Sequence, residues 1–152
     1  MKPLAAFFTV AVLLAASDAL ASGCGGHPVL STTREDGTSI GLVISGEQMA
    51  ETPVWLPEEG EPPLPLSHAA RIALEWAEGV YTRYDSVHIH SINLRSYGCW
   101  SSRGPDLRSR WYYVFNFAPV IDGNSVFGGG NFAAVLMDGT VIGPETVDRD
   151  RP

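Results

Sequence analysis

Residues 67–80 read Ser-His-Ala-Ala-Arg-Ile-Ala-Leu-Glu-Trp-Ala-Glu-Gly-Val, and the apolar members recur with the spacing of one helical face. That face, at i, i+3, i+4, i+7, i+8 and i+11, consists of Ala69, Ile72, Ala73, Trp76, Ala77 and Val80. Ser67 offers a hydroxyl that can cap the first turn. Polar residues, His68, Arg71, Glu75 and Glu78, occupy the opposite face. The pattern predicts a helix that lies on a hydrophobic core with its other face in solvent.

Three extended segments follow the helix, at 87–97, 110–120 and 132–142. The stretches between them, 98–109 and 121–131, are rich in turn residues and have lengths suited to antiparallel connections. Asp138-Gly139 stands between two apolar runs of the last segment and predicts a hairpin.

In the segment 110–120, both the odd-numbered and the even-numbered positions hold apolar residues. Its odd positions hold Trp111, Tyr113, Phe115 and Phe117, and its even positions include Tyr112, Val114 and Val120. A strand that is apolar on both sides is typical of the centre of a sheet, and we expect the large aromatic side chains to lie under the helix.

These elements predict a two-layer α+β domain over residues 67–145, in which one helix packs on a three- to four-stranded antiparallel sheet. Residues 22–45 are predicted to be an N-terminal extension with a short strand at 40–44. Residues 46–66 contain five prolines and are predicted to be a Pro/Glu-rich linker, because proline removes donors and fixes φ. Residues 146–152 are predicted to be a charged tail.

The first 21 residues have the features of a secretory signal peptide. Met1-Lys2 precedes an apolar run from Leu4 to Ala16, and Ala19 and Ala21 form a small-x-small site. The run is shorter than the roughly 20 apolar residues that span a bilayer. We therefore expect cleavage after Ala21 and an exported protein, periplasmic or secreted, with no membrane span.

The sequence contains two cysteines, Cys24 and Cys99. In an oxidising compartment they predict one disulfide between the two. The alternative is that Ala21-Ser22-Gly23-Cys24 is a lipobox and that Cys24 carries a lipid anchor. We prefer the disulfide, since acylation of Cys24 would leave Cys99 as a lone thiol outside the cytoplasm.

The chain is acidic, with 17 Asp and Glu against 10 Lys and Arg and a net charge of −7. Such a surface repels phosphate backbones and anionic lipid headgroups. The charge therefore argues against a nucleic-acid partner.

Part of the chain resembles a known family. Leu66-Ser67 opens the helix and is followed by alanines, Trp111-Tyr112-Tyr113-Val114 is similar to a tyrosine-valine strand, and residues 135–142 are similar to a valine-aspartate turn that leads to glycine and valine. Over residues 66–142 the sequence resembles the PepSY domain. The resemblance implies a small non-catalytic module of the cell envelope that binds or restrains peptidases, and it supplies no catalytic residues.

Two motifs have a superficial likeness to nucleophile sites. Gly37-Thr38-Ser39-Ile40-Gly41 matches Gly-x-Ser-x-Gly, but its serine precedes a strand and no helix follows. Gly98-Cys99-Trp100 is similar to the surroundings of a papain-type thiol, but that family brings its histidine from downstream, and every histidine of this chain lies upstream. No catalytic residue and no cofactor are predicted.

His88-Ile89-His90 and the glycine-rich stretch 127–131 are weaker candidates. Residues two apart in a strand point to the same side, so His88 and His90 could share a metal ion if a distant residue supplied a third ligand. Phe127-Gly128-Gly129-Gly130-Asn131 leads into a strand and not into a helix, so it predicts a flexible turn and not a phosphate site.

The sequence thus favours an exported, non-catalytic binding module of the bacterial cell envelope. Its expected partner is an envelope protein or peptide, bound along a sheet edge or at the loop that holds Trp100 and Arg103. Two alternatives stay open: a small metal- or thiol-dependent enzyme that uses His88 and His90 or Cys99, and a lipoprotein anchored through Cys24.

Overall fold

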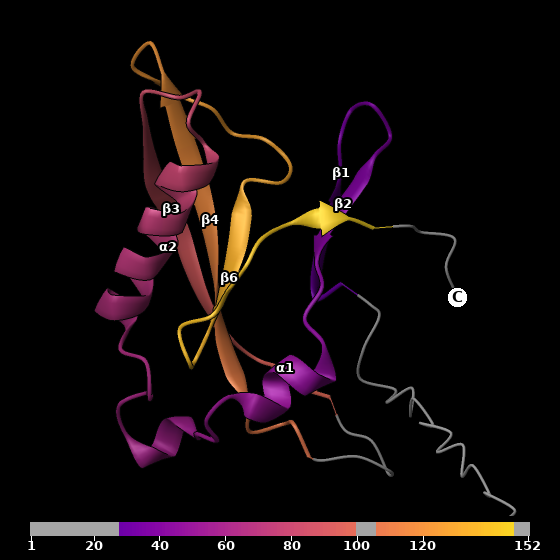
Figure 1. The fold of residues 1–152 in the computed structure, drawn as a ribbon, viewed down its shortest axis with the longest axis vertical. Coiled ribbons are helices and arrows are strands. Elements are labelled where there is room, and N and C mark those ends of the chain that lie inside the picture. The colour runs from indigo at the N-terminus through magenta and orange to yellow at the C-terminus, as the bar shows by residue number, and fades with distance from the viewer. Residues whose placement is uncertain (1–27, 100–105, 148–152) are drawn as a thin grey trace, which may run out of the picture.

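The computed structural model describes residues 28–99 and 106–147 (Figure 1). The elements in chain order are β1 (Leu30–Thr33), β2 (Ser39–Leu42), α1 (Gly46–Glu51), the 3₁₀ turn η1 (Pro57–Glu59), α2 (Leu66–Val80), β3 (Ser86–Ser96), β4 (Trp111–Ile121), β5 (Asn124–Ser125), β6 (Phe132–Leu136), β7 (Val141–Ile142) and β8 (Glu145–Thr146). The predicted signal peptide (residues 1–21) and Cys24 lie outside the described residues.

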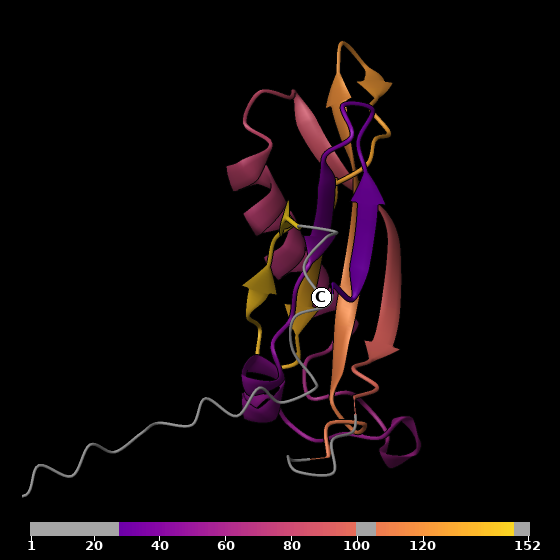
Figure 2. The ribbon, with the colours of Figure 1, turned by 90° about the vertical axis from the view of Figure 1, so that its right-hand side faces the viewer.

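The described strands form two antiparallel sheets. The main sheet has the order β3-β4-β6-β7, with β5 paired to β4, and the smaller sheet has the order β1-β2-β8. Figure 2 shows α2 on one side of the long strands β3 and β4. The predicted α+β class, with a helix on an antiparallel sheet and 110–120 as a central strand, is confirmed.

Helix α2 packs on the main sheet through small residues. Ala69, Ala73 and Ala77 are fully buried, and their short side chains allow the helix axis to approach the strands closely. Ile72 and Trp76 are partly buried on the same face, whereas Val80 is exposed. The predicted face is therefore correct up to its last turn.

The helix begins two residues earlier than a cap at Ser67 would place it. Its N-cap is Pro65, whose carbonyl accepts hydrogen bonds from the amides of His68 and Ala69 at 3.0 Å. The prediction of Ser67 as the cap was wrong, because proline fixes φ where the helix begins and the chain enters the helix at Leu66.

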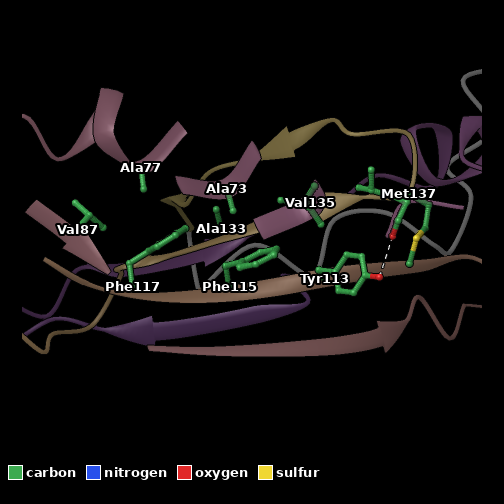
Figure 3. Packing of buried hydrophobic residues seen from close by; sticks show 11 residues of the cluster. Ala73, Ala77, Val87, Tyr113, Phe115, Phe117, Ala133, Val135 and Met137 are labelled. Atoms are coloured by element: carbon green, nitrogen blue, oxygen red, sulfur yellow. Dashed lines mark hydrogen bonds between the residues drawn. The ribbon is translucent and has the colours of Figure 1, made fainter. Parts of the chain in front are cut away.

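The aromatic residues at odd positions of β4 lie under the helix, as predicted. Tyr113, Phe115 and Phe117 point toward α2 together with Val135 of β6 (Figure 3). The Phe115 and Phe117 rings are stacked, with centroids 6.4 Å apart. The Tyr113 hydroxyl donates to the carbonyl of Leu64 at 3.0 Å, so this buried polar group is paired.

The opposite face of the main sheet is covered by the N-terminal segment. A second buried cluster joins this face to the N-terminal segment; its members are Ile40, Leu42, Ile44, Met49, Leu107, Tyr112, Val114, Phe132, Ala134 and Leu136. The short strand predicted at 40–44 corresponds to β2 (Ser39–Leu42), and residues 28–45 pack on the main sheet instead of forming a separate extension. The sequence did not show this, because the contacts join segments about 70 residues apart.

The predicted linker at 46–66 is also wrong. Ser45 caps α1 through a reciprocal pair, in which Gln48 N donates to Ser45 Oγ at 3.1 Å and Ser45 N donates to Gln48 Oε1 at 2.8 Å. Helix α1 fits before the first proline, Pro53, and Met49 on it is fully buried. Trp55 and Leu64, which stand among the prolines, are buried as well.

Two Asp-Gly pairs make the tight turns of the main sheet. Asp138-Gly139 joins β6 and β7, as predicted, and Asp138 Oδ1 accepts from the Thr140 amide at 2.9 Å. Asp122-Gly123 joins β4 and β5 with φ of 50° and 75°, the conformation of a two-residue hairpin. The predicted charged tail begins with a paired residue, since Thr146 of β8 lies opposite Ile40.

Candidate binding surface

Strand β3 is an edge strand of the main sheet, and within the described residues it pairs only with β4. At its end the Tyr97 amide donates to the carbonyl of Arg110, directly opposite, at 2.8 Å. Hydrogen-bonded and non-hydrogen-bonded pairs alternate in an antiparallel ladder, so the amides of Ile92, Leu94 and Ser96 face away from β4. Residues 91–96 therefore present backbone donors and acceptors to the outside of the sheet.

A β-bulge interrupts this edge at His90. Ile89 lies opposite Phe117 and Ser91 lies opposite Asn116, so His90 is an extra residue without a partner position on β4. A bulge twists an edge strand and prevents continuous pairing with another chain. The free edge is divided into two parts, and 91–96 is the longer regular one.

The bulge also affects the prediction that the side chains of His88 and His90 point to the same side of the strand. His88 lies opposite Ala118, but the two-residue alternation does not continue across the bulge to His90. Instead, the His90 ring meets the Phe127 ring edge-on, with centroids 5.2 Å apart. Residues 28–99 and 106–147 contain no group of three or more His, Cys, Asp or Glu side chains that could hold a metal ion.

Cys99 follows the C-terminal end of β3 and packs, half-buried, against the cluster that contains Leu42 and Tyr112. In the described part of the chain no cysteine is a free thiol. Because Cys24 lies outside that part, its pairing with Cys99 stays a prediction. Trp100 and Arg103, the predicted partner-binding residues, also lie outside the described residues.

An open pocket of about 310 Å³ lies where β1, β3 and β4 meet the loop that precedes β6. Its lining residues are Leu30, Ser31, Thr32, His90, Asn116, Phe117, Phe127, Gly128, Gly129, Gly130, Asn131 and Phe132. None of these side chains is an Asp, Glu, Lys or Arg. The lining combines aromatic rings with hydroxyl, amide and imidazole groups, which is the usual composition of a small-molecule site.

The loop 127–131 contains a turn at residues 129–130, as predicted, and it lies close to the small sheet. A Cβ on Gly129 would come within 2.9 Å of Thr32 Oγ1, and a Cβ on Gly130 would collide with Ile40 Cδ1. The backbone of the loop is also bonded to β4, because Phe117 N donates to the Asn131 carbonyl at 2.8 Å. The glycines allow the loop to lie directly against β1 and β2.

Sequence reasoning did not identify Phe127 and Asn116 as site residues. Phe127 was part of a turn-rich stretch, and Asn116 was one polar residue in a core strand. An amide side chain between Phe115 and Phe117 is unusual in a core strand, so Asn116 could have been noticed in the sequence. Its role could not be predicted, because its hydrogen-bond partner, Ser91, lies on another strand (Asn116 Nδ2 to Ser91 Oγ, 3.0 Å).

In the part of the chain that the structure describes, no helix has the length and apolar character needed to cross a membrane. No family model, curated protein or solved structure matches the chain.

Proposed function

We propose that the protein is an exported, non-catalytic interaction module of the bacterial cell envelope, similar to PepSY domains, that binds an extended segment of another envelope protein along β3. The observation that carries the proposal is the free edge at residues 91–96, where the side of β3 that faces away from β4 pairs with no strand of the described chain. Strand addition uses such an edge: backbone hydrogen bonds supply affinity, and side chains at alternate positions supply selectivity.

The faces of β3 indicate what kind of segment would fit. Ile92 and Leu94 lie opposite Phe115 and Tyr113 and so share the helix-covered face. Leu94 is 40% exposed, which leaves apolar surface next to the free edge. The net charge of −7 repels acidic chains, so the segment is neutral or basic, with apolar residues at every second position.

The test uses two variants at one position. Leu94→Pro removes an amide that faces away from β4, a change that edge strands tolerate, and Leu94→Thr removes the same apolar side chain but keeps the amide. Envelope proteins crosslinked to the wild-type protein are identified, and the crosslinked segment is synthesised. We expect that segment to bind wild type and Leu94→Thr, and to bind Leu94→Pro at least about tenfold more weakly.

Hydrogen exchange gives the second readout. Binding should slow exchange at the amides of Ile92, Leu94 and Ser96 in the wild-type protein. Unchanged exchange at these amides, or equal affinity of Leu94→Pro and wild type, would contradict strand addition. Circular dichroism of each variant confirms that it is folded.

Export and the fate of Cys24 are proposals that rest on the sequence. The mass of the mature protein isolated from the bacterial envelope distinguishes cleavage after Ala21 from acylation at Cys24. A mass two hydrogens below that of the dithiol supports the Cys24–Cys99 bridge. A mass that shows an acylated Cys24 would instead exclude the bridge and support the lipoprotein alternative.

A further inference from the structure

Phe127 is an exposed aromatic residue on a fixed support. Its side chain is 67% exposed, more than any other large apolar side chain of the described residues. Gly129 and Gly130, which follow Phe127 in the loop, lie close to Thr32 and Ile40. The carbonyl of Asn131, at the end of the loop, accepts a hydrogen bond from the Phe117 amide of β4. The His90 ring, from the bulge in β3, packs against the Phe127 ring in a T-shaped arrangement. The fold therefore holds one face of an aromatic ring in solvent without a structural need for it.

The polar groups around the ring include no Asp, Glu, Lys or Arg side chain, and they can form hydrogen bonds. They are the hydroxyls of Ser31 and Thr32, the imidazole of His90 and the amides of Asn116 and Asn131. The bond from Asn116 Nδ2 to Ser91 Oγ fixes that amide and leaves Oδ1 as an acceptor for another group.

This lining selects by charge. The lining supplies no Asp, Glu, Lys or Arg side chain, so a phosphate, a carboxylate or an ammonium group would lose part of its hydration there without gaining an ion pair from the lining. The Arg34 guanidinium lies beside Gly130 but outside the lining. A neutral molecule with several hydroxyl groups meets no such penalty, because each hydroxyl can pair with groups that donate and accept. An apolar C–H face on the same molecule can lie on the negative face of the Phe127 ring.

We propose that this pocket binds a neutral sugar ring, which stacks on Phe127 and hydrogen-bonds to Thr32, His90 and Asn116. Neutral pyranoses carry an apolar C–H face and a rim of hydroxyl groups on one small ring. The site adjoins the proposed peptide edge, since Asn116 is bonded to Ser91, but none of residues 91–96 lines the pocket.

The experiment is an NMR titration of the mature protein with neutral and charged oligosaccharides. Cellotetraose and tetra-N-acetylchitotetraose are the neutral probes, and a tetramer of galacturonate is the charged control. We expect at least one neutral probe to give saturable shifts at the amides of residues 128–130 and at His90, and the galacturonate tetramer to give none.

Two variants test the role of the ring. Phe127→Ala should bind the neutral probe at least about tenfold more weakly, because the stacking face is lost. Val54→Ala, which removes exposed apolar surface outside the pocket, should bind like wild type. Wild-type affinity in Phe127→Ala overturns the proposal.

The other occupant of such a pocket is an aromatic side chain of a peptide. A phenylalanine-containing tetrapeptide is therefore titrated in the same way. Shifts at residues 128–130 with this peptide, together with none from either neutral oligosaccharide, overturn the sugar assignment. The Leu94→Pro variant should still bind the neutral probe, so failure of the peptide-edge proposal leaves this one testable.

Discussion

At the scale of single residues, two neighbouring glycines of the pocket loop have different roles. Gly130 has a φ of +106°, and a Cβ there would collide with Ile40 Cδ1, whereas a Cβ on Gly128 would have no neighbour within 4 Å. Gly130→Ala should lower the free energy of unfolding by about 2–4 kcal/mol through backbone strain and overpacking. Gly128→Ala should change it by less than about 0.5 kcal/mol. Urea unfolding of both variants measures the difference, and equal midpoints would contradict the packing described for this loop.

Tyr81 gives a prediction for alkaline pH. Burial, with a smaller contribution from nearby Tyr84, raises the pKa of Tyr81 from 10 to about 12. The unfolded chain therefore loses this proton before the folded protein does, and stability that is complete below pH 10 is lost as the pH rises from 10 toward 12. Urea midpoints at increasing pH should fall in this range, and less steeply in Tyr81→Phe. Burial also raises the pKa values of Tyr97, Tyr112 and Tyr113, so part of the decline should remain in that variant.

At the scale of elements, helix α2 depends on alanine at its contact with the sheet. Ala73 is fully buried against the layer that contains Phe115 and Val135. Ala73→Leu should destabilise the protein by about 1–3 kcal/mol or more, because the added carbons have no space. His68→Leu introduces the same side chain on the exposed face and should have an effect below about 0.5 kcal/mol. Thermal unfolding of the pair tests this, and a neutral Ala73→Leu would show that the helix can move away from the sheet at low cost.

The sequence predicted well those elements whose buried residues recur at a regular spacing within one segment. The alanine face of α2 and the aromatic parity of β4 are periodic patterns within one segment, so they could be assigned without tertiary information. Trp55 could not, because its position is set by a bond from its amide to the Ser109 carbonyl at 3.1 Å, 54 positions away in the chain. The prolines of 46–66 exclude a long helix or a central strand after Pro53, and the structure has neither there before α2. They gave no information about helix α1 or about which side chains are buried between the prolines.

The same distinction explains the candidate sites. The sequence predicted β3 as a strand, but its place at the edge of the sheet and the bulge at His90 depend on the pairing with β4. Phe127 was not predicted because exposure of an aromatic residue is decided by what packs beneath its loop, here Thr32 and Ile40.

At the scale of the whole molecule, the two buried clusters share the strands β4 and β6. Tyr113 and Phe115 face one cluster, while Tyr112 and Val114 face the other. Leu42→Ala, on the side away from α2, should therefore lower the stability of the whole protein by about 2–5 kcal/mol in one cooperative transition. Circular dichroism and tryptophan fluorescence should report the same midpoint. Separate midpoints would show that the N-terminal layer unfolds independently.

The pairing of β2 with β8 has a consequence for how the chain is made. The partners, Ile40 with Thr146 and Gly41 with Glu145, are separated by more than 100 residues. A chain that emerges from a ribosome or a membrane pore with its N-terminus first must present β2 long before β8 arrives, so the small sheet stays incomplete until residues 145–146 appear. Until β8 arrives, a translating or translocating intermediate keeps one side of β2 unpaired.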